Sequence, residues 1–112
     1  MRTKFTLILP LLLSGCAALD VPAICPFQYD AKARALVESE IAKKYNPDTV
    51  SSFKTEEPIT FTHYSDGVDI MIAARHDKLF LYEGHFVVQI NPCTGNVVQS
   101  YYRGINKLYE TK

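Results

Sequence analysis

The chain has 112 residues, with 12 Lys or Arg and 12 Asp or Glu side chains, so its formal charge is zero. This balance argues against a dedicated nucleic-acid binder, which usually carries a basic stripe. Hydrophobic residues make up 47% of the chain, which is too many for a disordered protein, and the length is typical of one domain.

Residues 1–15 have the pattern of an export signal. Arg2 and Lys4 give a positive start, and the segment 5–13 that follows is mostly apolar. This segment is too short to cross a bilayer about 30 Å thick as a helix. We therefore expect a secretory signal that is removed on maturation.

Leu13-Ser14-Gly15-Cys16 resembles the lipobox of bacterial lipoproteins. The resemblance implies a diacylglycerol on the Cys16 sulfur, cleavage just before Cys16, and a further acyl chain, such as palmitate, on the new amino terminus. Stable membrane anchoring needs more than one acyl chain. Ala17, rather than Asp, follows the cysteine, which implies the periplasmic face of the outer membrane, with residues 16–29 as a lipidated tether. The alternative is an ordinary secretory signal in which Cys16 has no special role.

A lipid on Cys16 leaves two further cysteines, Cys25 and Cys93. Export places them where disulfides form and persist, so we expect them to pair. The closed loop would stabilise the fold by about 4 kcal/mol in the chain-entropy model. The alternatives are two separate thiols or a metal site, and we expect no metal because no His lies at a zinc-like spacing from either cysteine.

Residues 31–45 have the composition and spacing of an amphipathic helix. Asp30 is a favoured N-cap, and Asn46-Pro47 ends the helical pattern. The apolar positions recur every four residues: Ala33, Val37, Ile41 and Tyr45. We expect this face to cover the domain's own sheet, with insertion into a partner's groove as the alternative.

The apolar period changes from about four to two in the second half of the chain. Residues 59–64 and 68–72 alternate on either side of Ser65-Asp66-Gly67, which predicts a hairpin. Residues 52–57 give a weaker strand signal, and residues 75–78, "RHDK", predict a polar break.

Two more strands are expected after that break. Residues 79–90 predict a strand with a bulge or bend at Glu83-Gly84, and residues 97–104 predict the last strand after the turn "NPCTGN". For residues 105–112 the sequence allows either a segment packed on the domain or a frayed tail. The sequence therefore predicts a single α+β domain over residues 30–112, with one N-terminal amphipathic helix packed on an antiparallel sheet of about four strands.

The helix and the final hairpin also carry a family resemblance. "YEGHFVVQINPCTGNVVQSY" is similar to the last hairpin of PepSY-type domains and of NTF2-fold immunity proteins, through the turn Asn91-Pro92-Cys93-Thr94-Gly95 and through Gly84 and Phe86 in the strand before it. The resemblance implies a cystatin-like or NTF2-like domain that binds another protein.

The sequence gives little support for catalysis. His63, His76 and His85 show no helical zinc spacing, with His76 expected in the exposed break, and no serine lies in a nucleophile elbow. We therefore expect a protein that is not an enzyme and that uses no cofactor.

Tyrosine and arginine side chains are the best candidates for contact with a partner. The candidates are Tyr64, Arg75, His76, Tyr82, Tyr101, Tyr102 and Arg103. Strand alternation requires one of Tyr101 and Tyr102 to leave the core side, although ordinary cross-strand packing is the alternative for any one tyrosine. We expect one protein partner and no nucleic acid, and two roles remain: an inhibitory or immunity-type module, or a small structural subunit of an envelope assembly.

Overall fold

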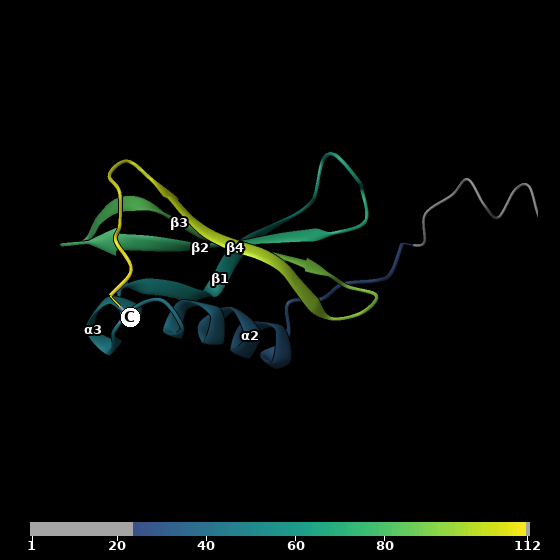
Figure 1. Cartoon of the computed structure of the whole chain (residues 1–112), viewed down its shortest axis with the longest axis horizontal. Coiled ribbons are helices and arrows are strands. Elements are labelled where there is room, and N and C mark those ends of the chain that lie inside the picture. The colour runs from purple at the N-terminus through teal and green to yellow at the C-terminus, as the bar shows by residue number, and fades with distance from the viewer. Residues whose placement is uncertain (1–23, 112) are drawn as a thin grey trace, which may run out of the picture.

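The computed structural model describes residues 24–111 (Figure 1). The predictions for the signal peptide, for the lipid on Cys16 and for the tether up to residue 23 lie outside the described residues. Within residues 24–111, no helix combines the length and the apolar character needed to cross a membrane.

The described part of the chain is a helix followed by a four-stranded antiparallel sheet, which confirms the predicted α+β class. The elements are α2 (Ala31–Ala42), α3 (Pro47–Val50), β1 (Phe53–Thr62), β2 (Ile70–Lys78), β3 (Leu81–Asn91) and β4 (Asn96–Gly104). The strands lie side by side in the order β1-β2-β3-β4. Figure 1 shows α2 and α3 along one side of this sheet, with no helix on the other side.

Local capping chemistry sets both helices. The Asp30 carboxylate accepts a hydrogen bond from the Ala33 N–H at 2.9 Å, which confirms the predicted N-cap. The helix ends at Ala42, earlier than expected, and Tyr45 is nevertheless buried. Asn46 then caps the short α3, which the sequence analysis did not predict.

The main core lies between α2 and the sheet. Its buried residues are Val37, Ile41, Tyr45, Phe53, Ile72, Ala74, Phe86, Val88 and Ile90. The Tyr45 ring lies 5.5 Å from the Phe53 ring and 6.1 Å from the Phe86 ring, centroid to centroid. The apolar face of α2 therefore covers its own sheet, and the alternative of a groove-binding helix is wrong.

The predicted polar break at residues 75–78 is wrong. β2 continues through Lys78, because the alternation of inward and outward side chains continues through these polar residues. Arg75 faces outward, and its Nε pairs with an Asp77 oxygen at 2.7 Å. His76 faces the core and is only 6% exposed, contrary to the expectation of an exposed position.

β1 joins two segments that the sequence suggested separately. Lys54 pairs with Arg75 and Ile59 pairs with Ala73, so residues 55–58 form a bulge opposite Ala74 alone. Pro58 lies in this bulge, where its missing N–H costs no ladder hydrogen bond.

The predicted bulge at Glu83-Gly84 is confirmed. His76 pairs with Gly84 and Asp77 with Tyr82, which leaves Glu83 as the extra residue. A side chain at position 84 has no room, because a Cβ there would lie 2.5 Å from the Gly104 Cα and 2.6 Å from the Arg103 carbonyl oxygen. The close approach of the β4 backbone therefore requires glycine at this position.

Both ends of the described chain are fastened to the domain. Cys25 and Cys93 form the expected disulfide, with their Cα atoms 5.2 Å apart. This bond ties residues 24–30, which we call the leading segment, to the β3–β4 turn. At the other end, the Thr111 N–H donates to the Lys44 carbonyl at 2.8 Å, and Leu108 packs against the core. The C-terminal segment is thus packed rather than frayed.

Candidate functional site

The sheet face away from α2, which we call the open face, is built from three rows of side chains across the strands. Cross-strand partners place their side chains next to one another on the same face. The cationic row is Lys54, Arg75, His85 and Arg103; the apolar row is Ile59, Ala73, Val87 and Tyr101; the third row is Phe61, Met71, Gln89 and Gln99.

The centre of the open face is a second, smaller apolar cluster. Met71, Ala73 and Val87 are buried there and pack against Tyr101. Ile59 and Phe61 stay half exposed on the outer strand β1. A solvated sheet face normally alternates to polar residues, so this apolar centre is unusual for a face that no other element of residues 24–111 covers.

A shallow hollow of about 460 Å³ lies on the open face. Its lining includes Ile59, Tyr82, His85, Tyr101, Arg103 and Ile105. It therefore combines apolar walls with cationic and hydroxyl groups, a mixture that suits recognition of a protein surface.

Tyr82 is held in place by its neighbours on the cationic row. Its hydroxyl lies 3.0 Å from His85 Nδ1, and the Arg75 guanidinium lies 5.2 Å from the centre of the Tyr82 ring. Burial lowers the pKa of His85, and the charge of Arg75 lowers that pKa further. His85 is therefore neutral at pH 7, and the charge of the row resides on Lys54 and the two arginines.

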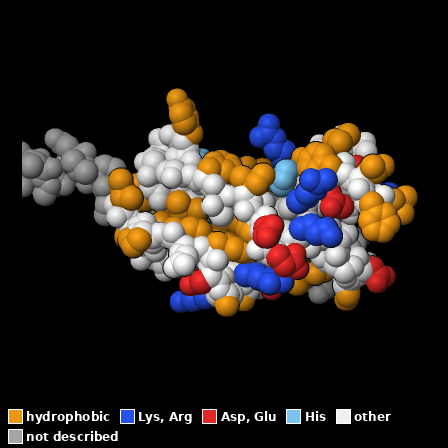
Figure 2. Space-filling view, turned by 180° about the vertical axis from the view of Figure 1, so that it is seen from behind, with side chains coloured by type: hydrophobic (Ala, Val, Ile, Leu, Met, Phe, Trp, Pro, Cys, Tyr) orange, Lys and Arg blue, Asp and Glu red, His pale blue; other side chains and the backbone are white. Residues whose placement is uncertain are grey.

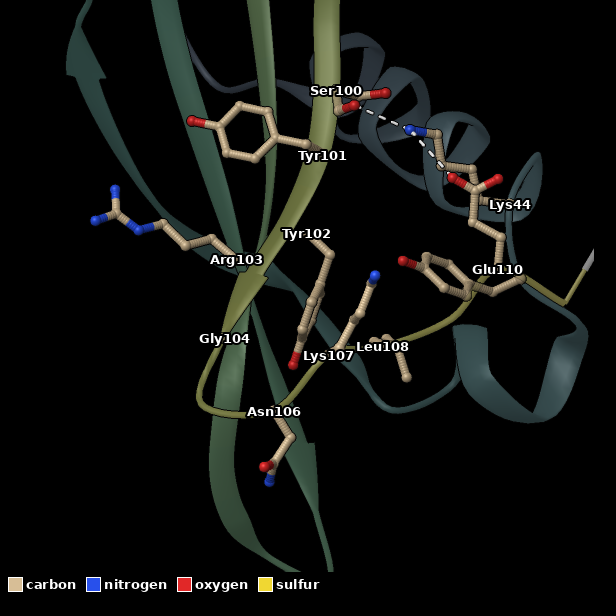
Figure 3. A pocket seen from close by; sticks show the side chains of 11 residues that line it. Lys44, Ser100, Tyr101, Tyr102, Arg103, Gly104, Asn106, Lys107, Leu108 and Glu110 are labelled. Carbon is tan, nitrogen blue, oxygen red and sulfur yellow. Dashed lines mark hydrogen bonds and ion pairs between the residues drawn. The ribbon is translucent and has the colours of Figure 1, made fainter.

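Arg103 is the cation that lines the hollow. Arg75 is paired with Asp77, whereas Arg103 forms no ion pair within residues 24–111. Figure 3 shows Arg103 and Tyr101 extending from the same side of β4, and Tyr102 from the opposite side. Alternation along the strand thus brings one tyrosine and one arginine to the open face together.

The predicted contact residues lie in three different parts of the domain. Arg75, Tyr82, Tyr101 and Arg103 come together on the open face. Tyr64 lies apart from them, fully exposed between β1 and β2. His76 and Tyr102 face the helix side, where His76 Nδ1 lies 3.0 Å from the Tyr102 hydroxyl, so they belong to the core rather than to the face.

Several residues of the open face were not among the predicted contacts. They are Lys54, Ile59, Phe61 and His85. His85 lies two residues before Val87 and therefore on the same face of β3. This spacing could have assigned His85 to the face of Tyr101 if the register of β3 with β4 had been known. The β1 residues could not be assigned, because the bulge at residues 55–58 changes which side chains face outward.

A second pocket, of about 670 Å³, lies between β4 and the C-terminal segment (Figure 3). The Lys44 Nζ lies in it, donating to the Ser100 carbonyl at 2.9 Å and lying 3.9 Å from a Glu110 carboxylate oxygen. The contact with Ser100 ties the turn after α2 to β4, and the contact with Glu110 ties the same turn to the C-terminal segment. The pocket therefore has a structural explanation, and the open face is the stronger candidate site.

The described residues do not provide a metal centre. Within residues 24–111, no three His, Cys, Asp or Glu side chains lie close enough together to hold a metal ion. The open face offers aromatic, apolar and cationic side chains.

Comparison with known proteins gives no relative from which a role could be transferred. The fold and the open face therefore have to be interpreted from their own geometry. No protein-family model matches the chain, and no curated protein or solved structure is significantly similar to it.

Proposed function

We propose that the chain is a lipid-anchored envelope protein that binds another protein through its open face. The observation that carries this proposal is the convergence of Tyr82, Tyr101 and Arg103 around one hollow on an uncovered sheet face. Tyrosine and arginine dominate the binding energy of protein interfaces. The apolar row beside them supplies a centre that a partner can desolvate.

Two features support an envelope location. The disulfide between Cys25 and Cys93 suits an oxidising compartment outside the cytosol. The lipobox resemblance at residues 13–16 supplies the anchor on Cys16 and, through Ala17, the outer membrane as its destination.

Within this proposal, we assign the domain to the cystatin-like group. The long helix α2 packed on an antiparallel meander supports this assignment. An NTF2-like cone is the alternative that the resemblance of the last hairpin implies.

The cationic row favours an inhibitory or immunity-type role over a permanent structural subunit. Obligate interfaces are more apolar and resemble a protein core, whereas separable partners meet through mixed surfaces. Arg103 beside Tyr101 gives the open face such a mixed character. A permanent subunit would be expected to cover Ile59 and Phe61 with a wholly apolar surface.

Photo-cross-linking in the source cells tests the proposal. A photo-reactive phenylalanine analogue in place of Tyr101 should give a cross-link to one other protein, and Arg103→Glu should reduce its yield at least tenfold, because an acid replaces the cation that lines the hollow beside Tyr101. The analogue at Ser39, on the exposed side of α2, should give no such product.

Lys32→Glu is the matched control for the charge change, since Lys32 is exposed on the helix side. It should leave the cross-link from position 101 unchanged. A product that is equally strong from positions 39 and 101, or one insensitive to Arg103→Glu, would contradict binding through the open face.

A further inference from the structure

The turn between β2 and β3 has a backbone that its residues do not favour. Lys78 pairs with Leu81, so Leu79 and Phe80 are the two central residues of the hairpin turn. Their φ angles are 52° and 67°, both in the left-handed region. A two-residue turn of this kind normally uses Asn-Gly or another small pair, and bulky side chains at positive φ are true outliers.

The same residues are also almost fully exposed. Leu79, Phe80 and Leu81, which we call the apolar tip, are 82%, 99% and 71% exposed. Figure 2 shows hydrophobic side chains gathered at the end of the molecule away from the grey N-terminal residues. Neither turn geometry nor packing explains these three side chains, and outliers of this kind persist mainly where a function requires them.

The tip lies at the end of the sheet opposite the leading segment. In a meander, the β1–β2 and β3–β4 turns share one end, and the β2–β3 turn lies at the other. The disulfide from Cys25 to Cys93 holds the leading segment at the β3–β4 turn (Figure 1). An anchor on Cys16 would therefore hold the other end of the domain toward the membrane and direct the tip away from it.

The tip is continuous with the open face. Tyr82 directly follows the tip and lines the hollow, and Ile105 lines the same hollow while its N–H donates to the Glu83 carbonyl at 2.8 Å. A partner that covers the open face at this end would therefore also meet the tip.

Positive side chains lie beside the tip, at Lys78, and behind it in the cationic row. Lys54, Lys78 and Arg103 form no ion pair within residues 24–111, whereas Asp77 is paired with Arg75. Glu83, in the bulge, is the opposing acid. A matching surface would carry acidic groups around an apolar centre.

We infer that the apolar tip inserts into an apolar pocket with an acidic rim, in the folded protein that the open face binds. The inference rests on the proposed function and adds the chemistry of the partner's site. A protruding Leu-Phe-Leu turn needs a concave acceptor, and its position opposite the anchor favours a protein over the anchoring bilayer.

The double substitution Leu79→Asn with Phe80→Gly separates a structural role from a binding role. Asn-Gly is the preferred pair for this turn, so the variant should fold and unfold at a higher temperature than the wild type. Its cross-link from position 101 should nevertheless fall at least tenfold. Val98→Asn, which removes an exposed apolar side chain from β4, is the control and should leave the cross-link unchanged.

The photo-reactive analogue placed at Phe80 in the full chain identifies the occupant. We expect an adduct with the same protein that position 101 captures. Adducts with lipid alone, or with a second copy of this chain, would overturn the inference. The inference would be overturned, and the proposed function left intact, if position 101 gave an adduct that the Asn-Gly turn did not reduce and position 80 gave none. If neither position gave an adduct, both the inference and the proposed function would be contradicted.

Discussion

His76 is a titratable side chain placed inside the main core. Its ring lies 4.6 Å from the Phe53 ring, centroid to centroid, and its Nδ1 meets the Tyr102 hydroxyl. Burial lowers the pKa of His76, and the charge of Lys78 acts in the same direction, while Glu83 and Asp77 partly oppose them. Burial also raises the pKa of Tyr102 to about 12, so both partners are neutral at pH 7.

This environment predicts a loss of stability in mild acid. The unfolded chain takes up a proton on His76 near pH 6.5, whereas the folded chain takes it up only at lower pH. The free energy of unfolding should therefore fall as the pH drops below about 6.5, until the folded-state pKa of His76 is passed. In urea unfolding between pH 7.5 and 5.5, His76→Gln should show a shallower dependence on pH, with the remainder due to His85, whose pKa is also lowered.

Ile72→Val is a suitable control, because it removes one methylene from the same core and should cost about 1 kcal/mol at every pH. Its unfolding free energy should follow the wild-type pH profile, displaced downward. Overlapping profiles for the wild type and His76→Gln would mean that the core does not keep this histidine neutral.

The disulfide is the main link between elements that are far apart in the chain. Cys25 and Cys93 are separated by 68 residues, and a closed loop of this length is expected to add about 4 kcal/mol to the free energy of unfolding. Cys25→Ser, Cys93→Ser and the double variant should each lose this amount in urea unfolding. The losses should be equal rather than additive, because either substitution already removes the whole bond. Additive losses would indicate two independent thiols.

The elements that could be predicted are those set by neighbouring residues. Asp30 caps α2, the "NPCTGN" turn joins β3 to β4, and Glu83 forms the bulge, all through local backbone chemistry. The continuation of β2 through residues 75–78 was missed, because inward burial of His76 depends on the Phe53 and Tyr102 rings beside it. Local polarity does not contain that information.

The candidate site was predictable only in part, for a related reason. Alternation alone showed that Tyr101 and Tyr102 point to opposite sides of β4. The cationic row additionally requires Lys54 to be opposite Arg75, and that register depends on the bulge at residues 55–58. The apolar tip was missed because Leu79 and Phe80 look like strand residues, whereas the ladder makes them a turn.

On the scale of the whole molecule, the domain has two distinct ends. The leading segment and its disulfide are at one end of the sheet, the apolar tip is at the other, and the open face lies between them. Between Cys16 and Ile24 there is enough chain to reach at most about 29 Å when fully extended. A lipid on Cys16 would therefore keep the domain close to the bilayer, with the apolar tip at the end of the sheet away from the anchor.

Lipidation of Cys16 is the prediction on which this orientation depends. Growth of the source cells with an alkyne-tagged fatty acid should label the wild-type chain, and Cys16→Ala should abolish the label because the lipid-bearing sulfur is lost. The double variant Cys25→Ser with Cys93→Ser should remain labelled, since neither cysteine lies in the lipobox. An unlabelled wild-type chain would show that residues 1–15 act as an ordinary secretory signal, and the direction in which the apolar tip points relative to the membrane would then no longer follow from the fold.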